Sequence, residues 1–562
     1  MANYRTPGVY VEEISTLPPS VAEVATAVPA FIGYTENGPV DSAEPKIVRI
    51  ASMLEYKTAF GSASPSSFTV VEAADPTTAP SVQGPNNTHK FGLFYALSLY
   101  FNNGGGPCYV VSVGNYSMQP DKAQFTKGLN ALEKEDEPTL IVLTDAACLL
   151  SAGDYYELCG KALMQCKKLG DRFTILDVAP QTGKTDWEAF RDDASLSINL
   201  MYGAAYTPYL NTTLSYAYSE NEVQISGADS DSTTSSWEKV FDGLLVSYTG
   251  ANSEPQVKII ASGETITFED DSGNLTIRGA GSNTATDIAS AWEVLSEADK
   301  VAGFDLQVED DSLGNVNHTG GSFEKLVEQS SSSAGGTMAS LVRDEKGLPI
   351  SNPNTGLYNQ IKTVLAEQRV ELPPSAAMAG IYARVDREQG VWKAPANTGV
   401  LGVLGPVSKI TDDDQDRLNV DPTAGKSINA IRAFTGKGTL VWGARTLAGN
   451  DNEWRYVSVR RLFITIEEST KKASAFAVFE ANDQSTWLKV KAMIESYLYG
   501  LWEQGALAGS KPEDAYYVNV GLGKTMTPQD VLEGRMIVEI GIAAVRPAEF
   551  IILRFSHKLQ TT

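Results

Sequence analysis

Three Gly-Lys-Ser/Thr triplets come closest to a known chemical motif, the phosphate-binding P-loop: Gly183-Lys184-Thr185, Gly425-Lys426-Ser427 and Gly523-Lys524-Thr525. A P-loop also needs a glycine five residues before the glycine of the triplet, because the backbone amides of this loop wrap the phosphates. The three corresponding positions hold valine, namely Val178, Val420 and Val518. The sequence therefore predicts no nucleotide-binding loop.

The cysteines and histidines lack the spacing of a metal site. They are Cys108, Cys148, Cys159, Cys166, His89, His318 and His557. No two cysteines have Cys-x2-Cys or another zinc spacing. Cys159 and Cys166 lie seven residues apart, two helical turns on one apolar face, which favours buried free thiols over a disulfide or a metal site. The histidines are far apart in sequence, so nothing local indicates a catalytic triad or a metal cluster.

No other constellation for catalysis stands out. The sequence contains no Gly-x-Ser-x-Gly nucleophile elbow, and the acidic run at residues 412–414 lacks the ligand order of an EF-hand. We therefore expect a protein that binds and assembles, with no catalytic residue, no cofactor and no metal. The alternative is an enzyme with a cryptic catalytic domain, which would need a pocket with a convergent nucleophile and base.

Composition and charge narrow the class of protein further. The 562 residues suggest three to four domains, and 42% of them are hydrophobic. The 45 basic and 69 acidic residues give a net charge of −24, which argues against binding to nucleic acid. No apolar run approaches the roughly 18 residues of a membrane helix, and the start lacks the hydrophobic core of a signal peptide. We expect the protein to be made in the cytoplasm, without insertion into a membrane.

The elements expected before residue 210 alternate between strand and helix. Residues 139–143 form a continuous apolar run of the buried, parallel-sheet type. Residues 154–169 repeat apolar side chains at helical spacing and stop at Gly170, and residues 172–178 form the next strand. This order predicts a βαβ unit. Upstream, a helix over 91–101 and a strand over 108–113 flank a glycine-rich turn.

An acidic block interrupts this pattern. Residues 211–350 contain 23 acidic and 7 basic residues, a net charge of −16, which is two thirds of the charge of the whole chain. Alternating runs at 264–268 and 274–278 are typical of half-buried antiparallel strands. The block is predicted to be a β-rich inserted domain that faces outward, with a variable surface region of one large domain as the alternative.

Both ends of the chain are predicted to be strands. Residues 7–14 are strand-like and precede a Leu-Pro-Pro sequence that holds the chain extended. Two amphipathic helices are expected over 462–479 and 487–502, followed by strands over 534–540 and 549–555. Terminal strands with free edges can dock on a neighbouring sheet or pair within their own subunit. The pattern alone favours neither.

Several short motifs occur together in this chain. They cover residues 6–13 (Thr-Pro-Gly-Val-Tyr-Val-Glu-Glu), 30–34, 103–105, 372–375, 379–384, 390–397 (Gly-Val-Trp-Lys-Ala-Pro-Ala-Asn), 441–446, 459–461 and 547–550 (Pro-Ala-Glu-Phe). Jointly they resemble the contractile tail sheath proteins of phages, R-type bacteriocins and extracellular contractile injection systems. The resemblance spans residues 1–210 and 354–562 and stops across 211–353, where members of the family carry variable outer domains.

The resemblance implies a multidomain fold of α/β and α+β type, with terminal strands exchanged between subunits. Its parts would be an N-terminal linking arm (1–20), the first part of a discontinuous α/β sheath core (21–210), the acidic β-rich outer insertion (211–353), the second part of the core (354–450), and an α+β inner domain that faces the tube and ends in a C-terminal linking strand (451–562). The implied function is that of a structural subunit. Hexameric rings would polymerise helically around an inner tube and contract to drive the tube through a target membrane.

The resemblance also implies roles for particular residues. Val9, Tyr10 and Val11 would lie on the incoming arm of the strand exchange, and Phe550, Ile552 and Phe555 on the receiving end. A helix of the inner domain would contact the tube through basic side chains, for which Lys471 and Lys472 are the candidates. On the residues alone, Glu467/Lys471 and Glu468/Lys472 are i,i+4 pairs that any exposed helix can carry.

The implied partners are neighbouring sheath subunits, the inner tube protein, and the baseplate and terminal cap proteins. Sheath paralogues stay open as further partners, and no nucleic acid is expected. The product would be a phage tail or a phage tail-like particle, with release on lysis as one route out of the cell. The alternative function is a non-contracting, sheath-like collar, cap or tube-associated component of the same machine. Binding of a sugar or a cell surface by the acidic block is a further alternative to simple solvation.

Overall fold

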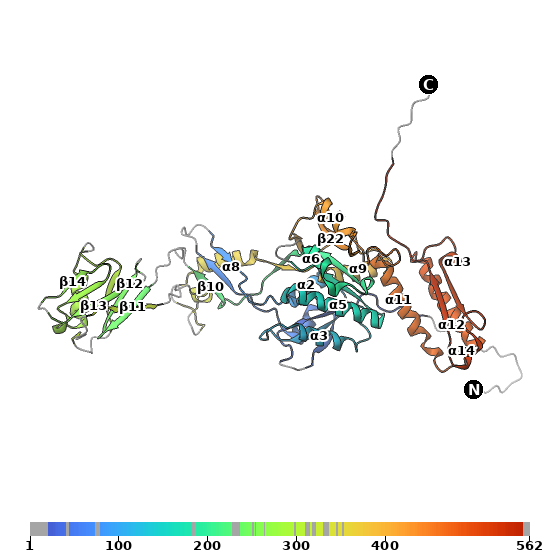
Figure 1. The fold of residues 1–562 in the computed structure, drawn as a ribbon, viewed down its shortest axis with the longest axis horizontal. Helices are drawn as coiled ribbons and strands as arrows, with labels where there is room; N and C mark the ends of the chain where they lie inside the picture. Colours follow the sequence, from blue (N-terminus) through green and yellow to red (C-terminus); the bar gives the residue numbers. More distant parts are fainter. Residues whose placement is uncertain are drawn as a thin grey trace, which may run out of the picture. The chain divides into compact units, whose positions relative to one another are not determined.

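The protein folds into two compact units that are described separately. The computed structural model describes residues 21–40, 44–72, 79–180, 186–226, 236–249, 252, 254–262, 265–296, 299–309, 315–316, 322–329, 336–343, 347–350 and 353–554. Unit 1 comprises residues 1–65, 87–217 and 368–562, and unit 2 comprises residues 66–86 and 218–367. The fold is a mixed α/β, multidomain one (Figure 1).

A nine-stranded sheet forms the centre of unit 1. Its strands lie in the order β2 (Lys46–Ile50), β5 (Cys108–Gly114), β1 (Pro29–Tyr34), β6 (Leu140–Val142), β7 (Phe173–Asp177), β8 (Gly203–Thr207), β22 (Ile428–Phe434), β23 (Gly438–Val441) and β20 (Thr398–Gly399). Pairing is parallel from β5 to β22 and antiparallel at the two margins. Strands β1, β7 and β8 are buried along their whole length, as expected for parallel strands covered on both faces.

The predicted βαβ unit is confirmed. Strand β6, helix α5 (Ala152–Leu169) and strand β7 follow one another, and β6 pairs with β7 in parallel. Ser151 caps the helix by accepting a hydrogen bond from the backbone N–H of Asp154, and Gly170 ends it with a φ of +77°. The predicted helix and turn upstream are confirmed as well. Helix α2 (Leu93–Asn102) leads into a turn in which Gly104 has a φ of +93°.

The other helices of the α/β part surround this sheet and a small antiparallel sheet in the order β19-β9-β21. The small sheet consists of β19 (Arg369–Leu372), β9 (Leu210–Ser215) and β21 (Val403–Pro406). The helices are α1 (Met53–Phe60), α3 (Lys122–Leu132), α4 (Thr144–Leu149), α6 (Asp186–Asp192), α9 (Ser375–Gln389) and α10 (Asp412–Asn419).

The C-terminal part of unit 1 has its own hydrophobic core. It contains α11 (Val457–Ala473), α12 (Gln484–Glu503), α13 (Pro512–Ala515), α14 (Pro528–Leu532), β24 (Tyr516–Val520) and β25 (Val538–Ile542). Helix α11 also contributes Val457 and Ile464 to the core of the large sheet, so it joins the two cores.

Three sequence-based predictions for this part need correction. Helix α11 begins at Val457 instead of 462, because Arg460 and Arg461 are buried in ion pairs and hide the amphipathic pattern. It ends at Ala473, and a 3-10 turn (Ser474–Ala477) follows before Phe479, whose φ is +67°. The strand expected over 549–555 is absent from residues 549–554, since no neighbouring strand of the same subunit pairs with them.

Unit 2 contains two four-stranded sheets with a common core and one three-stranded sheet. The four-stranded sheets have the orders β16 (Phe304–Val308), β12 (Leu244–Thr249), β11 (Ser236–Phe241), β18 (Val327–Gln329), and β14 (Thr267–Asp270), β15 (Leu275–Arg278), β13 (Gln256–Ile260), β17 (Glu324–Lys325). Helix α7 (Ala285–Glu293) packs on them and buries Trp292. The predicted antiparallel runs near 264–278 correspond to the β14–β15 pair.

The boundaries of unit 2 differ from the sequence-based range 211–353. The third sheet has the order β10 (Val223–Ser226), β3 (Phe68–Val71), β4 (Ser81–Gln83), so residues 66–86 cross over into this unit. At the other boundary, residues 210–215 belong to unit 1 through β9, and α8 (Thr355–Glu367) belongs to unit 2. The division into five parts stays a prediction.

Candidate inter-subunit site

Strands β24 and β25 form a two-stranded sheet with free edges. They pair antiparallel, from Tyr516 opposite Ile542 to Val520 opposite Val538. Val518 of β24 packs in the core formed with α11 and α12. Within the described residues no third strand joins this sheet. Each strand therefore presents an edge of backbone N–H and C=O groups that can accept another strand.

The chain leaves this sheet as an extended, apolar segment. Val545 donates a backbone hydrogen bond to Ala506, and residues 550–553 follow soon after. Their side chains are strongly exposed: Phe550 71%, Ile551 81%, Ile552 77% and Leu553 72%. Burial of one such side chain is worth about 1.5–3 kcal/mol. Four of them in a row on an extended backbone are typical of a strand that docks on a partner.

Glu549 lies directly before this apolar run and is held by the core of the subunit. Its Oε1 accepts a hydrogen bond of 2.8 Å from Arg445 Nε, and its Oε2 one of 2.5 Å from Arg445 Nη2. The hydroxyl of Tyr456 donates to Oε2 at 3.3 Å. Only 6% of the Arg445 side chain and 20% of the Glu549 side chain are exposed.

The N-terminal segment at residues 21–28 follows helix α11. The backbone N–H of Val24 donates to Ser469 Oγ at 3.2 Å, and Arg461 Nη2 donates to the carbonyl of Thr26 at 2.8 Å. Val21 packs against the core of the C-terminal part. Residues 21–28, which follow the predicted N-terminal arm, therefore lie beside α11, the helix that links the two cores of unit 1. Val9, Tyr10, Val11 and Phe555 lie outside the described residues. Of the residues predicted for the strand exchange, the structure describes only Phe550 and Ile552, which are both exposed, and the exchange itself stays a prediction.

Lys471 and Lys472 lie at the end of α11 and differ in their surroundings. The ammonium of Lys471 is 3.1 Å from Glu468, and 70% of its side chain is exposed. Lys472 Nζ is 2.8 Å from Asp136 and 3.4 Å from Glu468. The hydrogen bond to Lys472 lowers the pKa of Asp136, and the same bond raises the pKa of Lys472. The pairing of Glu467 with Lys471, considered on spacing alone, is replaced by an Arg460–Glu467 pair.

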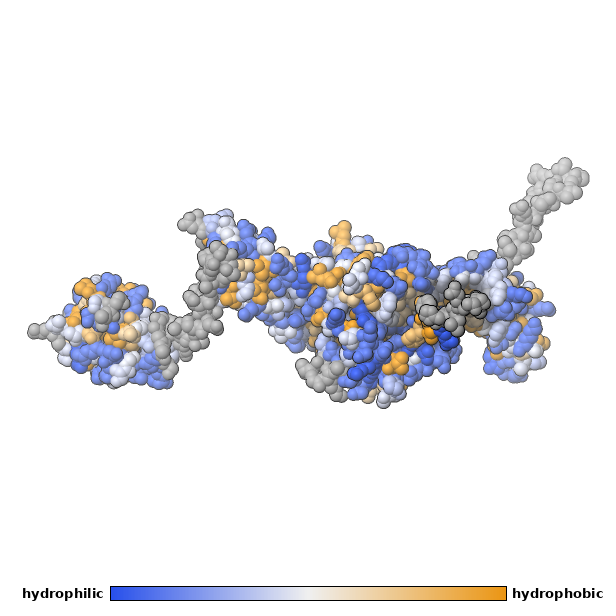
Figure 2. Space-filling model, turned by 90° about the horizontal axis from the view of Figure 1, so that it is seen from above, coloured by the Kyte–Doolittle hydropathy of each residue, from blue (hydrophilic) through white to orange (hydrophobic). Residues whose placement is uncertain are grey.

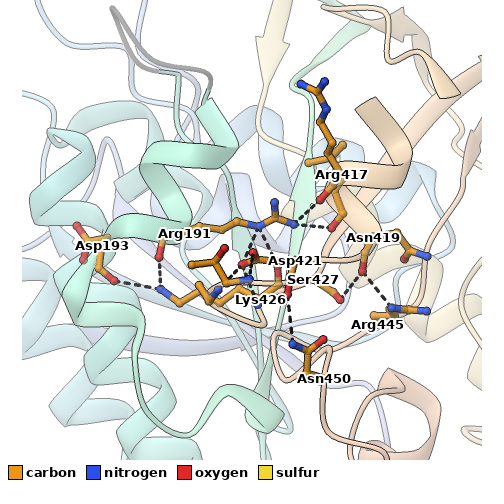
Figure 3. Close-up of polar contacts among 12 residues, drawn as sticks. Arg191, Asp193, Arg417, Asn419, Asp421, Lys426, Ser427, Arg445 and Asn450 are labelled. Atoms are coloured by element: carbon orange, nitrogen blue, oxygen red, sulfur yellow. Dashed lines mark hydrogen bonds and ion pairs between the residues drawn. The ribbon is translucent and has the colours of Figure 1, made fainter. Parts of the chain in front are cut away.

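The loop that contains Gly425-Lys426-Ser427 is filled by side chains of the protein itself (Figure 3). The carboxylate of Asp421 accepts hydrogen bonds from the backbone N–H groups of Thr423, Ala424 and Lys426. These bonds and Arg191 hold the pKa of Asp421 below its usual value even though burial raises it. Lys426 Nζ donates to the carbonyl oxygens of Arg191 and Asp193. The loop amides that would bind phosphate in a P-loop bind a carboxylate here.

Two carboxyl groups are fully buried near the ends of β6 and β7. Asp145 accepts backbone hydrogen bonds from Tyr34, Gly92 and Leu93, and Asp177 accepts from the backbone N–H and the hydroxyl of Ser375. Burial raises the pKa of each to about 7, against the opposing effect of these bonds. They satisfy the N-terminal amides of helices α2 and α9, which is a structural role.

The cysteines are free thiols, and Cys108, Cys159 and Cys166 are buried. Burial raises the pKa of all four thiols, which makes them poor nucleophiles. Among the described residues no group of three or more His, Cys, Asp or Glu side chains could hold a metal ion. No helix among the described residues is both long enough and apolar enough to cross a bilayer.

Two family models match adjoining stretches of the chain. The phage tail sheath protein central domain matches residues 333–447, and the phage tail sheath C-terminal domain matches residues 449–558. The second stretch holds α11, α12, the two-stranded sheet and the exposed apolar segment. The chain belongs to the contractile tail sheath family.

Two solved structures, one of a sheath and one of a baseplate, extend the likeness over the full length of the chain. The sheath of the PVC extracellular contractile injection system in its contracted state is 27% identical, with a TM-score of 0.52, over 100% of this chain and 99% of that chain. A chain of the anti-feeding prophage baseplate is 26% identical, with a TM-score of 0.55, over 99% and 100%. The tail sheath protein of Vibrio phage KVP40 is 25% identical over 185 residues, 33% of this chain and only 26% of the phage protein.

The sequence analysis missed Arg445 and Glu549, although both lie in motifs of the sheath family. Arg445 is the charged residue of the motif at 441–446, and Glu549 that of the motif at 547–550. Each of these two motifs is otherwise largely apolar, so its single charged residue was the signal that could have indicated a functional contact. Their pairing across 104 residues of chain required the fold.

Proposed function

We propose that this chain is a structural subunit of a contractile tail sheath. Copies polymerise helically around an inner tube, and the sleeve contracts to drive the tube through a target membrane. The observation that supports this function most strongly is the exposed apolar run at residues 550–553, which lies in the same C-terminal part of unit 1 as a two-stranded sheet with free edges. A monomeric protein gains nothing from exposing such a run, whereas a polymer buries it at every joint.

In this proposal the terminal strands of neighbouring copies complete the sheet of a third copy. Val9, Tyr10 and Val11 belong to the arriving arm, and Phe550, Ile552 and Phe555 to the other end of the exchange. Backbone hydrogen bonds along the strand edges provide affinity, and alternate side chains provide register. The pairing of the terminal strands turns a stack of rings into a continuous mesh.

Contraction then needs no nucleotide. The extended sleeve is a trapped state held by tube and baseplate, and the contracted state makes better contacts between subunits. A gain of about 2 kcal/mol per subunit, the scale of one or two good contacts, becomes large when hundreds of copies convert together. Each subunit moves nearly as a rigid body so that the mesh survives.

Lys471 and Lys472 are the proposed contacts to the inner tube, through complementary acidic groups on that protein. The exposure of Lys471 supports this role. Lys472 shares its charge with Asp136 and Glu468 of its own subunit, so its contribution to the tube contact is the smaller of the two.

Unit 2 is proposed to face outward from the sleeve. Its residues include 26 acidic and 8 basic ones, so it carries −18 of the net charge of −24. A surface of this charge stays hydrated and discourages sleeves from adhering to one another. The further proposed partners are the baseplate and terminal cap proteins, within a phage tail or a phage tail-like particle.

A sheath-like component that does not contract is the second candidate. The likeness to a chain in the structure of the anti-feeding prophage baseplate supports it, because that structure is one of a baseplate. Such a protein forms single rings or short stacks instead of sleeves.

Electron microscopy of the purified chain, alone and co-expressed with its tube protein, distinguishes these functions. The proposal predicts long helical sleeves that enclose the tube, together with shorter, wider, empty sleeves. Isolated rings at every protein concentration would instead support the second candidate. Monomers that never assemble would contradict both.

A further inference from the structure

The Arg445–Glu549 pair is the last fixed point before the exposed apolar run. Within the described residues, Val545 makes a backbone hydrogen bond to Ala506, and Glu549 is the next residue of the segment that bonds to the core. Phe550 begins the exposed run one residue later. The contact therefore fixes the position and direction in which this run leaves the subunit.

Arg445 is held in place independently of Glu549. Its Nη1 donates to the carbonyl of Asn419 at 3.0 Å, and its backbone N–H donates to Asn429 Oδ1 at 2.8 Å. The amide of Asn429 donates back to the carbonyl of Arg445 at 2.8 Å and to the carbonyl of Ala205 in β8 at 3.1 Å. The guanidinium is thus tied to the central sheet.

The carbonyl of Asn419 is fixed in turn by the polar loop shown in Figure 3. It accepts a hydrogen bond of 2.7 Å from Ser427 Oγ, and the neighbouring carbonyl oxygens of Arg417 and Leu418 accept from Arg191 Nη2 at 2.7 and 2.8 Å. The carboxylate of Asp421 closes the loop by accepting hydrogen bonds from the backbone N–H groups of Thr423, Ala424 and Lys426. Through the carbonyl of Asn419, this loop supports Arg445.

Arg445, held in this way, forms a pre-ordered binding site for Glu549, which we call the Arg445–Glu549 socket. Such a site favours strand exchange for an entropic reason. A bidentate, charge-assisted contact fixes a carboxylate in both position and orientation. With Glu549 held, the free length of the docking strand begins at residue 550, whereas without it the free length begins near 546. Restricting the free end in this way raises its effective concentration at the neighbouring sheet.

We propose that Glu549 is a positioning residue for the strand exchange, which the pre-ordered Arg445 holds so that the run at 550–553 reaches a neighbouring copy. This inference rests on the proposed sheath function. It assigns the motifs at 441–446 and 547–550 to one socket, and it assigns the Gly425-Lys426-Ser427 loop to the support of that socket.

The test compares Glu549→Ala and Glu549→Gln with wild type. The control is Glu503→Ala, because Glu503 is an exposed glutamate at the end of α12. Freshly purified, unassembled subunit is digested with chymotrypsin, which cuts after Phe550, and separately with trypsin, which cuts after Arg554. We expect cleavage after Phe550 to become about tenfold faster in Glu549→Ala, because the segment can then open locally without breaking an ion pair. The increase should be smaller in Glu549→Gln. Cleavage after Arg554 and the thermal midpoint should stay at their wild-type values in both variants.

The same proteins are then assembled and the sedimentable sleeve is measured. We expect Glu549→Ala to form less than about a tenth of the wild-type amount under conditions where the control forms it fully. Equal amounts of sleeve from wild type and Glu549→Ala would overturn the inference and leave the sheath function intact. A wild-type protein that forms no sleeve would contradict the sheath function. The proteolysis comparison would then decide the inference, and unchanged cleavage after Phe550 in Glu549→Ala would overturn it.

Discussion

Arg461 of α11 and Asp386 of α9 form a buried ion pair between the C-terminal part of unit 1 and the α/β sheet. Arg461 Nη2 lies 2.5 Å from Asp386 Oδ2, and the two side chains are 3% and 5% exposed. The hydroxyl of Thr26 also donates to Asp386 Oδ2 at 2.6 Å. Three segments far apart in sequence meet at one carboxylate. The contact joins the C-terminal part, with its exposed apolar segment, to the large sheet.

The surface of the protein carries hydrophobic patches among hydrophilic areas (Figure 2).

The first prediction concerns this ion pair. Asp386→Ala should lower the free energy of unfolding by about 3 kcal/mol, because it leaves the guanidinium of Arg461 buried without its anion. The double variant Asp386→Leu/Arg461→Met should recover most of this loss, since apolar side chains need no partner. Urea unfolding of the unassembled subunit measures both, with Asp413→Ala on the exposed face of α10 as the control. A loss below about 1 kcal/mol in Asp386→Ala would refute the structural role.

The second prediction concerns pH. Burial raises the pKa of Asp177 to about 7, well above the usual value of 3.8 that applies in the unfolded chain. Between these two values the folded state binds the proton and the unfolded state does not, so this group lowers the stability of the fold as the pH rises. Asp177→Asn should remove this dependence, because the amide can still accept from the Ser375 N–H and donate to its hydroxyl.

Urea unfolding at pH 5, 6 and 7 measures the effect. From pH 5 to pH 7 the wild type should lose about 2 kcal/mol more than Asp177→Asn, at roughly 1.4 kcal/mol per pH unit. Parallel stability curves for the two proteins would show that Asp177 titrates normally.

The third prediction concerns the exposed apolar run. Ile552→Asp should stop assembly without changing the thermal midpoint of the unassembled subunit, because the side chain is 77% exposed and has no partner to lose within the described fold. Leu532→Asp at the end of α14 is the matched control, since Leu532 is 83% exposed. Sedimentation and calorimetry check the two properties separately. Sleeves of normal length from Ile552→Asp would contradict a role of this run in strand exchange.

The fourth prediction separates the two lysines of α11. Lys471→Glu should abolish enclosure of the tube with little change in stability, because the side chain is mostly exposed. Lys472→Glu should reduce enclosure less than Lys471→Glu does. It should destabilise the subunit by about 1 kcal/mol, since it brings a third acid beside Asp136 and Glu468. Lys489→Glu on α12 is the control. Co-purification of the tube protein with sleeves provides the readout, and tubes retained by Lys471→Glu sleeves would assign the contact elsewhere.

The sequence predicted those elements whose signal is local. The run at residues 139–178 carried its own strand, helix and glycine stop, and α12 carried an unbroken apolar stripe. The start of α11 could not be predicted in this way, because Arg460 and Arg461 look solvent-exposed until their buried partners are known. The same holds for residues 66–86, which join unit 2 only because β3 pairs with β10 across about 150 residues of chain.

For the candidate site, the sequence allowed the residue types to be predicted but not their contacts in space. The apolar character of residues 550–553 is visible in the sequence, but a strand needs a partner, and the described chain supplies none. The socket formed by Arg445 and Glu549 depends on a distant contact that no local pattern reveals. The family resemblance singled out both motifs without indicating that they contact each other.

The central claim is that the ends of each chain bind neighbouring copies. It is tested most directly by electron microscopy of a variant that lacks residues 1–16 and 549–562, co-expressed with the tube protein beside the full-length chain. The account predicts that the trimmed chain stays folded, as judged by its thermal midpoint, and yields no sleeves, while the full-length chain yields sleeves that contract. Trimmed subunits that build sleeves of normal length and contract would contradict the account.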